Sequence, residues 1–431
     1  MKNTNTGDRA LTHVIATYRV RDKQENLSKR AEGIAVGLTV GSWTDLPAMK
    51  QSAVLRHCGT VEDIRVLDTS EAPSSDASVG DPVDRGHAAL DTVIADISIG
   101  YPIDNFNNTI TSILTTVFGK LSMDGEIRLI ALQIPDALAE RFSGPKFGVS
   151  GIRDRLKIYD RPLLMSIFKA CVGRDVSDLT KAFLEQARGG ADLIKDDEIF
   201  FSEQYATPEA RVAAFTEAAR QLQAETGQRV SYAVNLTGPV RQLFDRARRL
   251  AELGAGALLV NAVAYGYDVL AELAADPDVT VPLMVHPAVS GALYGSDTHG
   301  IAADIVLGSL MRLAGADIVI YPSPYGTVTL SRAEGLRLVD ALRTPSVHKE
   351  VLPAPSAGIF PGLVPKLVSD LGVDCIVNAG GAIHGHPGGA TDGAAAFMAS
   401  IEATVAGVSL EQAANGNAAL KAALKKWGQP S

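Results

Sequence analysis

Gly189-Gly190-Ala191-Asp192-Leu193-Ile194-Lys195-Asp196-Asp197-Glu198 is the stretch that decides the fold of this chain. The glycine pair is typical of a helix end, the apolar residues of a short buried strand, and four ionisable residues follow where the strand should stop. Side chains alternate along a strand, so we expect Lys195 and Asp197 on one face, Asp196 on the other and Glu198 at the turn. A lysine beside carboxylates at a strand end is either a solvated, salt-bridged turn or a chemical site.

The composition is that of a large globular enzyme. The chain has 431 residues, 46% of them hydrophobic and 21% charged, which predicts a large single-core architecture with an appended domain. Its net charge of −9 argues against nucleic acid or an anionic membrane as a partner. Residues 1–6 lack the apolar core of a signal peptide, and no apolar run approaches the ~20 residues of a membrane span. Cys58, Cys171 and Cys375 indicate no disulfide framework, so we expect a cytoplasmic protein.

Residues 1–145 are predicted to form an α+β domain, because strand-like and helix-like segments mix there without a repeating unit. The predicted segments are strands at 14–20 and 127–132, helical or mixed structure at 88–94 and 108–118, and an acidic, Ser- and Pro-rich loop at 68–84.

Residues 146–431 show a regular alternation of short apolar runs and helical patterns. Eight runs are strand candidates: 163–169, 191–195, 230–236, 257–263, 282–286, 317–321, 350–355 and 374–379. The helical patterns lie at 178–188, 208–225, 240–253, 301–313, 332–342, 363–371 and 390–406. Several helices end in Gly-Ala-Asp or a similar triplet before the next strand. Eight β/α units in tandem predict a (β/α)8 TIM barrel with its active site at the carboxyl ends of the strands.

Chemically suggestive residues lie at those strand ends. Lys169 follows the first strand, Lys195 to Glu198 the second, His286 the fifth and Ser356 the seventh. The pair Gly380-Gly381 follows the eighth strand, where many barrels bind phosphate through backbone amides. We therefore expect a phosphorylated small-molecule substrate at this face.

The run from Lys195 to Glu198 resembles the active-site signature of the RuBisCO superfamily. In that family the lysine is carbamylated by carbon dioxide and binds magnesium together with the second aspartate and the glutamate. The resemblance implies that Lys195 (as its carbamate), Asp197 and Glu198 are ligands of Mg²⁺. Magnesium prefers oxygen ligands, and carbamylation converts an ammonium group into an anionic oxygen ligand.

The likeness extends over nearly the whole chain. The segment 41–44 is similar to one that contacts a substrate phosphate, the segment around Asn108 to one with an active-site asparagine, and residues 144–164 to the start of the barrel. The residues that the resemblance assigns to substrate or phosphate binding are Ser42, Trp43, Asn108, Ser356, Gly358, Gly380 and Gly381.

The departures from the carboxylases concern the groups that fix carbon dioxide. The second lysine of their Lys-Pro-Lys motif is Cys171, the arginine after the histidine of the fifth strand is Pro287, and the histidine after the sixth strand is Tyr321. The loop 323–332 contains no lysine, and an amino-domain glutamate is replaced by Gly37. Loss of these donors and cations weakens binding of a bisphosphate. The resemblance thus implies a RuBisCO-like protein of the non-carboxylating branch.

The acid/base groups are expected among Lys169, Lys120 and His286. The segment 118–125 resembles the one that supplies the general base in the methionine-salvage enolases of the family, and 322–326 is similar to their loop. Lys120 is then that base; the alternative is a solvated turn lysine.

Other residues have both a structural and a functional interpretation. His384 and His386 are either loop histidines or part of the site, and Cys171 is a buried small residue or a nucleophile. Three asparagines near strand ends either satisfy backbone groups or touch the substrate: Asn235, Asn261 and Asn378.

The implied chemistry is formation of an enediolate beside a metal-bound carbonyl. Three reactions remain open: tautomerisation of a phosphorylated diketone, an aldose/ketose-type isomerisation such as that of methylthioribulose phosphate, and decarboxylation of a phosphorylated β-keto sugar acid. The alternative class is a catalytically silent barrel that binds a sugar phosphate and regulates. The resemblance also implies a homodimer, or a higher oligomer, in which Asn108 and Lys120 act in the partner subunit's site.

Overall fold

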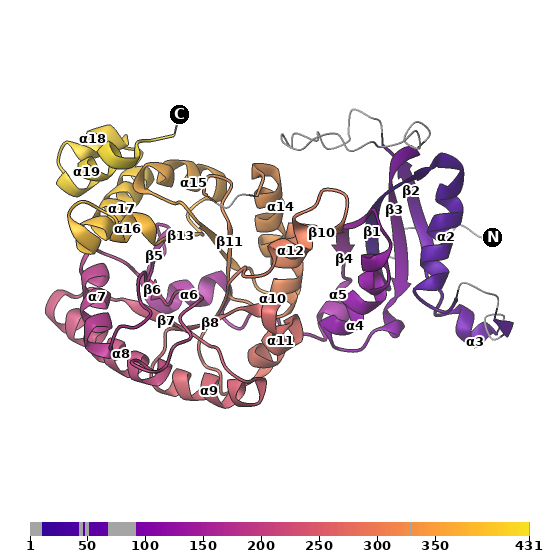
Figure 1. Cartoon of the computed structure of the whole chain (residues 1–431), viewed down its shortest axis with the longest axis horizontal. Helices are drawn as coiled ribbons and strands as arrows, with labels where there is room; N and C mark the ends of the chain where they lie inside the picture. The colour runs from indigo at the N-terminus through magenta and orange to yellow at the C-terminus, as the bar shows by residue number, and fades with distance from the viewer. Residues whose placement is uncertain (1–10, 43–45, 48–50, 68–91, 328–329, 431) are drawn as a thin grey trace. The chain divides into compact units, whose positions relative to one another are not determined.

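The computed structural model describes residues 11–42, 46–47, 51–67, 92–327 and 330–430. The predicted loop at 68–84 lies outside these residues. The chain forms two compact units, one of Met1–Phe142 with Ser290–Val306 and the other of Ser143–Val289 with Leu307–Ser431 (Figure 1). The first unit is therefore built from two separate parts of the chain.

The first unit contains a five-stranded sheet with strand order β10-β4-β1-β3-β2. Its long central strand has alternating buried and half-buried residues, the signature of a strand with one face against a core. The strands are β1 His13–Lys23, β2 Thr60–Val66, β3 Thr92–Pro102, β4 Ile127–Gln133 and β10 Gly300–Ile301. Among the helical segments are α2 Leu27–Gly37, α3 Ser52–Leu55, α4 Ile110–Leu114, the π-helical η4 Thr115–Gly119, α5 Asp136–Ala139 and α12 Gly291–Tyr294. The predicted strands at 14–20 and 127–132 are confirmed.

Two local predictions are wrong because a distant strand decides the structure. Residues 92–94, predicted as helical or mixed, begin β3, which pairs with β1 along its whole length. Residues 300–301, of which only 301 was placed in the predicted helix 301–313, form β10 and pair in parallel with Arg128 and Leu129 of β4. Tertiary pairing overrides local propensity at both places.

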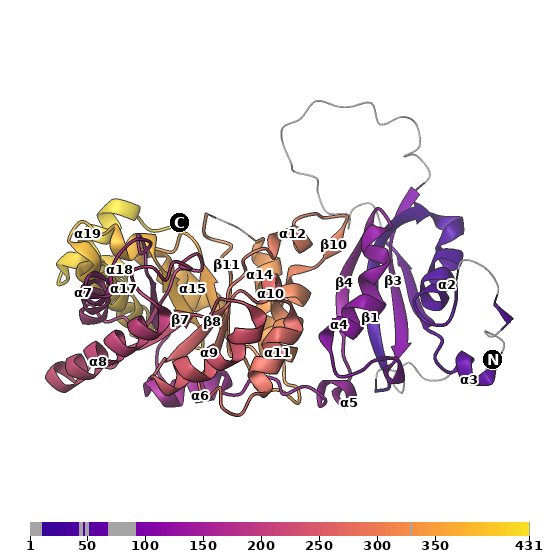
Figure 2. The ribbon, with the colours of Figure 1, turned by 60° about the horizontal axis from the view of Figure 1, so that its bottom comes forward.

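The second unit is a barrel of eight parallel strands surrounded by helices (Figures 1 and 2). All eight predicted strands are confirmed. They are β5 Leu163–Ile167, β6 Leu193–Lys195, β7 Ser231–Asn235, β8 Ala257–Val260, β9 Leu283–Val285, β11 Ile318–Pro322, β12 Leu352–Ser356 and β13 Ile376–Ala379. The first and last strands, β5 and β13, pair with each other, and the described ring is interrupted only where β12 and β13 lie side by side without a ladder.

The helices of the second unit mostly follow the predicted alternation. They are α6 Gly148–Leu156, α7 Val176–Arg188, α8 Pro208–Thr226, α9 Val240–Glu252, α10 Ala262–Tyr265, α11 Tyr267–Ala275, α13 Leu310–Leu313, α14 Arg332–Arg343, α15 Val364–Leu371, α16 Gly381–His384, α17 Gly389–Val405, α18 Leu410–Ala414 and α19 Ala418–Trp427. In the described part of the chain, no helix is long and apolar enough to cross a membrane.

Alternation along the strands fills the barrel with apolar side chains. Leu163, Met165, Leu193, Leu259 and Met284 belong to one buried cluster inside the barrel. The same cluster includes two residues of α6, which closes the amino-terminal end of the strands. Apolar side chains thus fill the amino-terminal part of the barrel interior. The next inward-facing position on a strand lies two residues further along, at its carboxyl end, where polar side chains are found.

The aspartates of the recurring Gly-x-Asp triplets have a structural role. Asp317 accepts hydrogen bonds from the backbone N–H of Phe147, Gly148 and Leu283, which fixes the start of α6 to two strands. Asp192 makes a bidentate pair with Arg161. These carboxylates lie before their strands, at the opposite end from the predicted site.

Candidate active site

The run after β6 turns its two aspartates to opposite sides, as the alternation predicted. Asp197 faces Lys169, whose Nζ lies 2.6 Å from its Oδ2. Asp196 instead faces Arg211 of α8, whose Nη2 lies 2.8 Å from its Oδ2. Only Asp197 is thus directed toward the residues expected to do chemistry.

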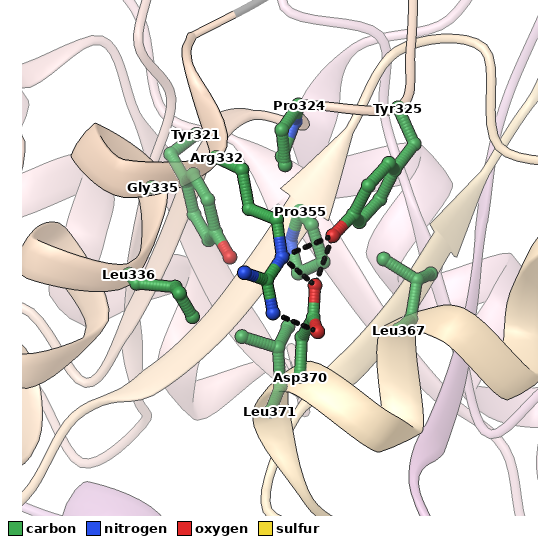
Figure 3. Close-up of a pocket in the computed structure, with 10 residues that line it drawn as sticks. All are labelled: Tyr321, Pro324, Tyr325, Arg332, Gly335, Leu336, Pro355, Leu367, Asp370 and Leu371. Carbon is green, nitrogen blue, oxygen red and sulfur yellow. Dashed lines mark hydrogen bonds and ion pairs between the residues drawn. The ribbon is translucent and has the colours of Figure 1, made fainter.

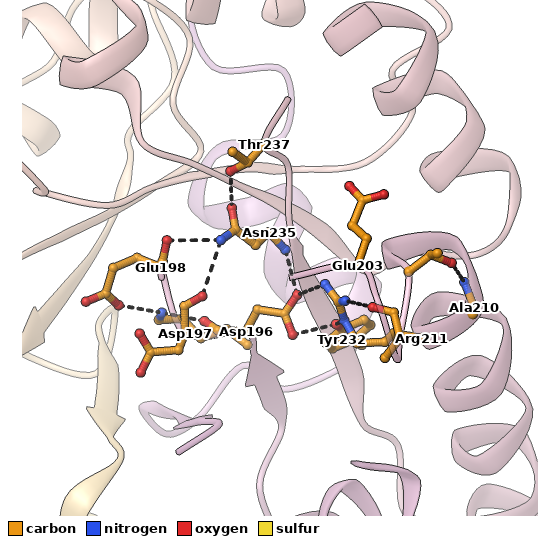
Figure 4. A network of polar contacts seen from close by, with 12 residues as sticks. Asp196, Asp197, Glu198, Glu203, Ala210, Arg211, Tyr232, Asn235 and Thr237 are labelled. Carbon is orange, nitrogen blue, oxygen red and sulfur yellow. Dashed lines mark hydrogen bonds and ion pairs between the residues drawn. The ribbon is translucent and has the colours of Figure 1, made fainter. Parts of the chain in front are cut away.

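Asp196 is the centre of a buried polar network (Figure 4). It is fully buried and accepts hydrogen bonds from Arg211, from the Tyr232 hydroxyl at 2.6 Å and from the Asn235 N–H at 2.9 Å. The Arg211 guanidinium also lies 4.1 Å from the ring centroid of Phe200. Burial would disfavour the charge of Arg211, but Tyr232 and Asp196 outweigh it and raise the pKa of Arg211. This network anchors the ligand run to the barrel wall.

Lys195 is buried completely, with its Nζ donating to the backbone O of Asp196 at 2.8 Å. Oε2 of Glu198 lies 4.0 Å from this Nζ. Burial lowers the pKa of Lys195 to about 8; Glu198 and Asp197 oppose this shift, and the positive charge of Lys169 adds to it. The amine is therefore neutral in a substantial fraction of molecules near pH 8, the form that reacts with carbon dioxide.

Lys169 follows β5, and its side chain passes beside Gly380, the residue after β13, while its Nζ reaches Asp197. A Cβ on Gly380 would lie 2.9 Å from the Lys169 Cε, so the glycine leaves room for this path. Burial by itself would raise the pKa of Asp197, but the hydrogen bond and charge of Lys169 outweigh it and hold that pKa below its usual value. Ala170 has φ +50°, and strain of this kind persists where the surrounding structure enforces it.

His286 follows β9 and faces Glu198, with Nε2 to Oε2 at 3.3 Å. The Ala288 N–H donates to Nδ1 at 3.2 Å, which assigns the proton of the neutral ring to Nε2. Burial, then the charge of Lys195, lowers the pKa of His286 to about 3. His286 is hence neutral, with its Nε2 in close contact with the Glu198 carboxylate.

Two of the three asparagines hold the backbone of the ligand run. Asn235 Nδ2 donates to the carbonyls of Asp197 and Glu198, and Asn261 Nδ2 donates to that of Glu198 at 3.4 Å. Asn378 is different, since it is buried and neither polar atom of its side chain has a hydrogen-bond partner among the described residues. The sequence left open whether these asparagines satisfy backbone groups or touch the substrate. The contacts show that Asn235 and Asn261 hydrogen-bond to backbone carbonyls.

The predicted phosphate-binding residues of the barrel lie after β12 and β13. Ser356 ends β12, and Ala357 and Gly358 follow with φ +69° and +71°. Gly380 and Gly381 begin α16. A left-handed conformation at the non-glycine Ala357 marks this turn as held in place by its surroundings.

The predicted residues of the amino-terminal domain lie in the first unit. Ser42 is half-buried, Asn108 is exposed, and Lys120 is exposed at the end of η4. Trp43 lies outside the described residues. The position of Asn108 and Lys120 in the complete site stays a prediction.

The remaining candidates are structural. His384 Nε2 contacts the Ile167 carbonyl at 3.0 Å, and His386 Nε2 contacts the Ala419 carbonyl at 3.0 Å. Cys171 is buried, and burial, followed by Asp196 and Asp197, raises the pKa of its thiol, which is the opposite of what a nucleophile requires.

The charge balance of the cluster fits a carbamate with a divalent cation. Within the described residues, no group of three or more His, Cys, Asp or Glu is placed to hold a metal ion. Lys169 and Lys195 balance Asp197 and Glu198 in charge. Carbamylation of Lys195 lowers the total charge by two, and one Mg²⁺ restores it. The oxygen-rich donor set is also the one magnesium prefers.

Comparison with known proteins places these residues in a family context. Residues 148–342 and 332–427 match the family described as ribulose bisphosphate carboxylase large chain, catalytic domain. The 2,3-diketo-5-methylthiopentyl-1-phosphate enolase of Geobacillus thermodenitrificans is 47% identical over 419 residues, which cover 97% of this chain and 98% of that protein.

Solved structures agree along the whole chain. A rubisco-like protein (MtnW) from Alicyclobacillus acidocaldarius subsp. acidocaldarius has a TM-score of 0.88 and 61% identity, and the match covers 97% of this chain and 100% of that one. An octameric ribulose-1,5-bisphosphate carboxylase/oxygenase from Pyrococcus horikoshii has a TM-score of 0.86 and 27% identity, with 99% and 95% covered.

Proposed function

The chain belongs to the RuBisCO large-chain family, in its RuBisCO-like branch, and from this premise we propose that it is a 2,3-diketo-5-methylthiopentyl-1-phosphate enolase. The observation that carries the proposal is 47% identity to such an enolase across 97% of the chain. Among the reactions left open by the sequence, this favours tautomerisation of a phosphorylated diketone over isomerisation and decarboxylation. The complete set Lys169, Lys195, Asp197 and Glu198 argues against a catalytically silent regulator.

The proposed cofactor is Mg²⁺ held by Asp197, Glu198 and the carbamate of Lys195. When bound, it would polarise the adjacent carbonyl oxygens of a diketone and make the neighbouring C–H more acidic. Asn235 and Asn261 keep the backbone of the ligand run in place, and the His286 ring lies against the Glu198 carboxylate, with Nε2 3.3 Å from Oε2.

Two lysines divide the proton transfers in this proposal. The Lys169 Nζ donates a hydrogen bond to Asp197 Oδ2 at 2.6 Å, and this carboxylate favours the charged form of the lysine. Lys169 therefore acts as a cationic hydrogen-bond donor to a substrate oxygen, and it is not the general base. Lys120 removes the proton from carbon, as its resemblance to the enolase segment implies. Ser356, Gly358, Gly380 and Gly381 bind the phosphate, with Ser42, Trp43 and Asn108 completing the substrate site.

The proposed active unit is a homodimer in which Asn108 and Lys120 serve the partner subunit's barrel. An octameric relative with the same fold supports the expectation of an oligomer.

The test is a direct assay of the purified protein with 2,3-diketo-5-methylthiopentyl 1-phosphate. We expect Mg²⁺- and bicarbonate-dependent formation of the enol product, loss of activity with EDTA, and no activity in Lys195→Ala. In a parallel reaction with ribulose bisphosphate and labelled carbon dioxide, no label should enter phosphoglycerate, because Cys171, Pro287 and Tyr321 replace groups of the carboxylases. A wild-type protein that binds the diketone without converting it would overturn the proposal in favour of a regulator.

A further inference from the structure

The loop after β11 is fastened to a neighbouring helix by a buried carboxylate. Tyr325 lies within this loop and Arg332 begins α14, and both side chains converge on Asp370 of α15 (Figure 3). Arg332 makes a bidentate pair, with Nη2 to Oδ1 at 2.7 Å and Nε to Oδ2 at 3.1 Å, and its Nε also donates to the Tyr325 hydroxyl at 3.2 Å. The Tyr325 hydroxyl donates to Oδ2 of Asp370. We call these three residues the clamp.

The clamp is shielded at Asp370, while the Arg332 side chain is 54% exposed. The Asp370 side chain is only 5% exposed, and the pocket around the clamp has a volume of about 10 Å³, at the lower limit for one water. The hydrogen bond from Arg332, and after it that from Tyr325, outweigh burial and hold the pKa of Asp370 below its usual value. A bidentate arginine pair with a shielded carboxylate is the strong form of this contact.

The loop fixed by the clamp supports the turn after β12. A Cβ on Gly326 would lie 1.8 Å from the Ala357 carbonyl oxygen, and one on Gly358 would lie 2.9 Å from the Thr327 nitrogen. The Ser323 N–H also donates to the Ser356 carbonyl at 2.9 Å. The two segments are therefore in direct backbone contact.

The turn at Ser356–Gly358, which this loop supports, has a strained backbone. Ala357 and Gly358 both have left-handed backbone angles, and a non-glycine residue keeps such a conformation only where neighbours enforce it. Gly326 directly follows Tyr325 and packs closely against the backbone of Ala357. The contacts thus run from Asp370 through Tyr325 and Gly326 to the turn at Ser356–Gly358.

We infer that Asp370 is a remote positioning residue for the phosphate group of the substrate, acting through Tyr325, Gly326 and the Ser356–Gly358 turn. The inference rests on the proposed function, since it takes that turn to bind phosphate. Asp370 and Arg332 need not touch the substrate for this role.

The experiment compares Asp370→Asn with the charge-matched Asp340→Asn, an exposed change on α14. Asp370→Asn should raise KM for the phosphorylated substrate about tenfold, with a much smaller change in kcat, because a displaced turn weakens phosphate binding. The affinity for inorganic phosphate should fall in parallel, and backbone amides of 323–327 and 356–360 should exchange hydrogen faster. Asp340→Asn should match wild type in all three measurements.

Two further variants keep the inference falsifiable. Tyr325→Phe retains the ring and removes one donor, so it should fold and change KM in the same direction by less. In the double variant, Tyr325→Phe should raise KM little beyond the effect of Asp370→Asn alone, since the two residues act through the same series of contacts. Unchanged KM, phosphate affinity and hydrogen exchange in folded Asp370→Asn or Tyr325→Phe would overturn the inference. A wild type that binds phosphate but lacks enolase activity would instead overturn the proposed function, and the phosphate and exchange measurements would still decide on the clamp.

Discussion

Asp196 and Asp197 are consecutive in sequence, yet one pairs with Arg211 in the barrel wall and the other with Lys169 at the barrel mouth. We therefore expect the same residue type to serve the fold at one position and the proposed chemistry at the next. Matched substitutions should separate the two roles.

Asp196→Asn should destabilise the protein by about 3–5 kcal/mol, because it leaves the buried Arg211 without its carboxylate. Asp197→Asn should change the free energy of unfolding far less, since Lys169 is 44% exposed and can be solvated, but it should abolish activity. Chemical denaturation and Mg²⁺ titration of both variants check this. If the free energy of unfolding falls equally in the two variants, the structural role of Asp196 and the proposed chemical role of Asp197 are not separate.

The initial rate of Lys195 carbamylation should depend on pH with a midpoint near 8. The neutral amine reacts, and its fraction rises tenfold per pH unit below the pKa and levels off above it. At pH 8 a lysine with an ordinary pKa would be neutral in only roughly 0.4% of molecules. The measurement is the initial rate at which the carbamate signal grows in ¹³C NMR at constant dissolved ¹³CO2 without magnesium, with Lys195→Arg as the control. An initial rate still rising tenfold per unit above pH 9 would contradict the prediction.

Gly380→Ala should impair catalysis by crowding Lys169. The added Cβ would lie 2.9 Å from Cε of that lysine, so the side chain has to shift and its contact with Asp197 should weaken; kcat should then fall roughly 10- to 100-fold. Gly416→Ala is the matched control, because nothing lies within 4 Å of its Cβ position. Wild-type kcat in Gly380→Ala would mean that Lys169 does not need its observed path.

Inactive Lys120→Ala and Lys195→Ala subunits should complement each other if the proposed shared site is correct. At equal mixing, half the dimers are mixed and each has one intact site, so about a quarter of the wild-type activity per site should return. Native mass spectrometry establishes whether mixed dimers form. Mixed dimers without activity would assign Lys120 to its own subunit or to no catalytic role.

Local patterns were sufficient for the barrel but not for its polar contacts. The eight strands were predictable because each is a short apolar run between helical patterns, and the opposite directions of Asp196 and Asp197 follow from strand alternation alone. The residues that fix this run come from elsewhere in the chain. Arg211 had one local signal, since it lies four residues before Phe215 on the apolar stripe of α8, where a charge needs a partner.

Long-range pairing explains the failures. Nothing in residues 300–301 indicates that their partner is Arg128 to Leu129, so a helix was the better local interpretation. Asn235 and Asn261 could be placed at strand ends, but which backbone they hold depends on how neighbouring strands align.

The excursion of Ser290–Val306 into the first unit limits how this protein can be divided or recombined. A gene cut after Phe142 does not yield two self-contained modules, because the barrel half would contain a strand whose partner, β4, is encoded upstream. Exchange of one unit between family members must therefore transfer two separate coding segments together.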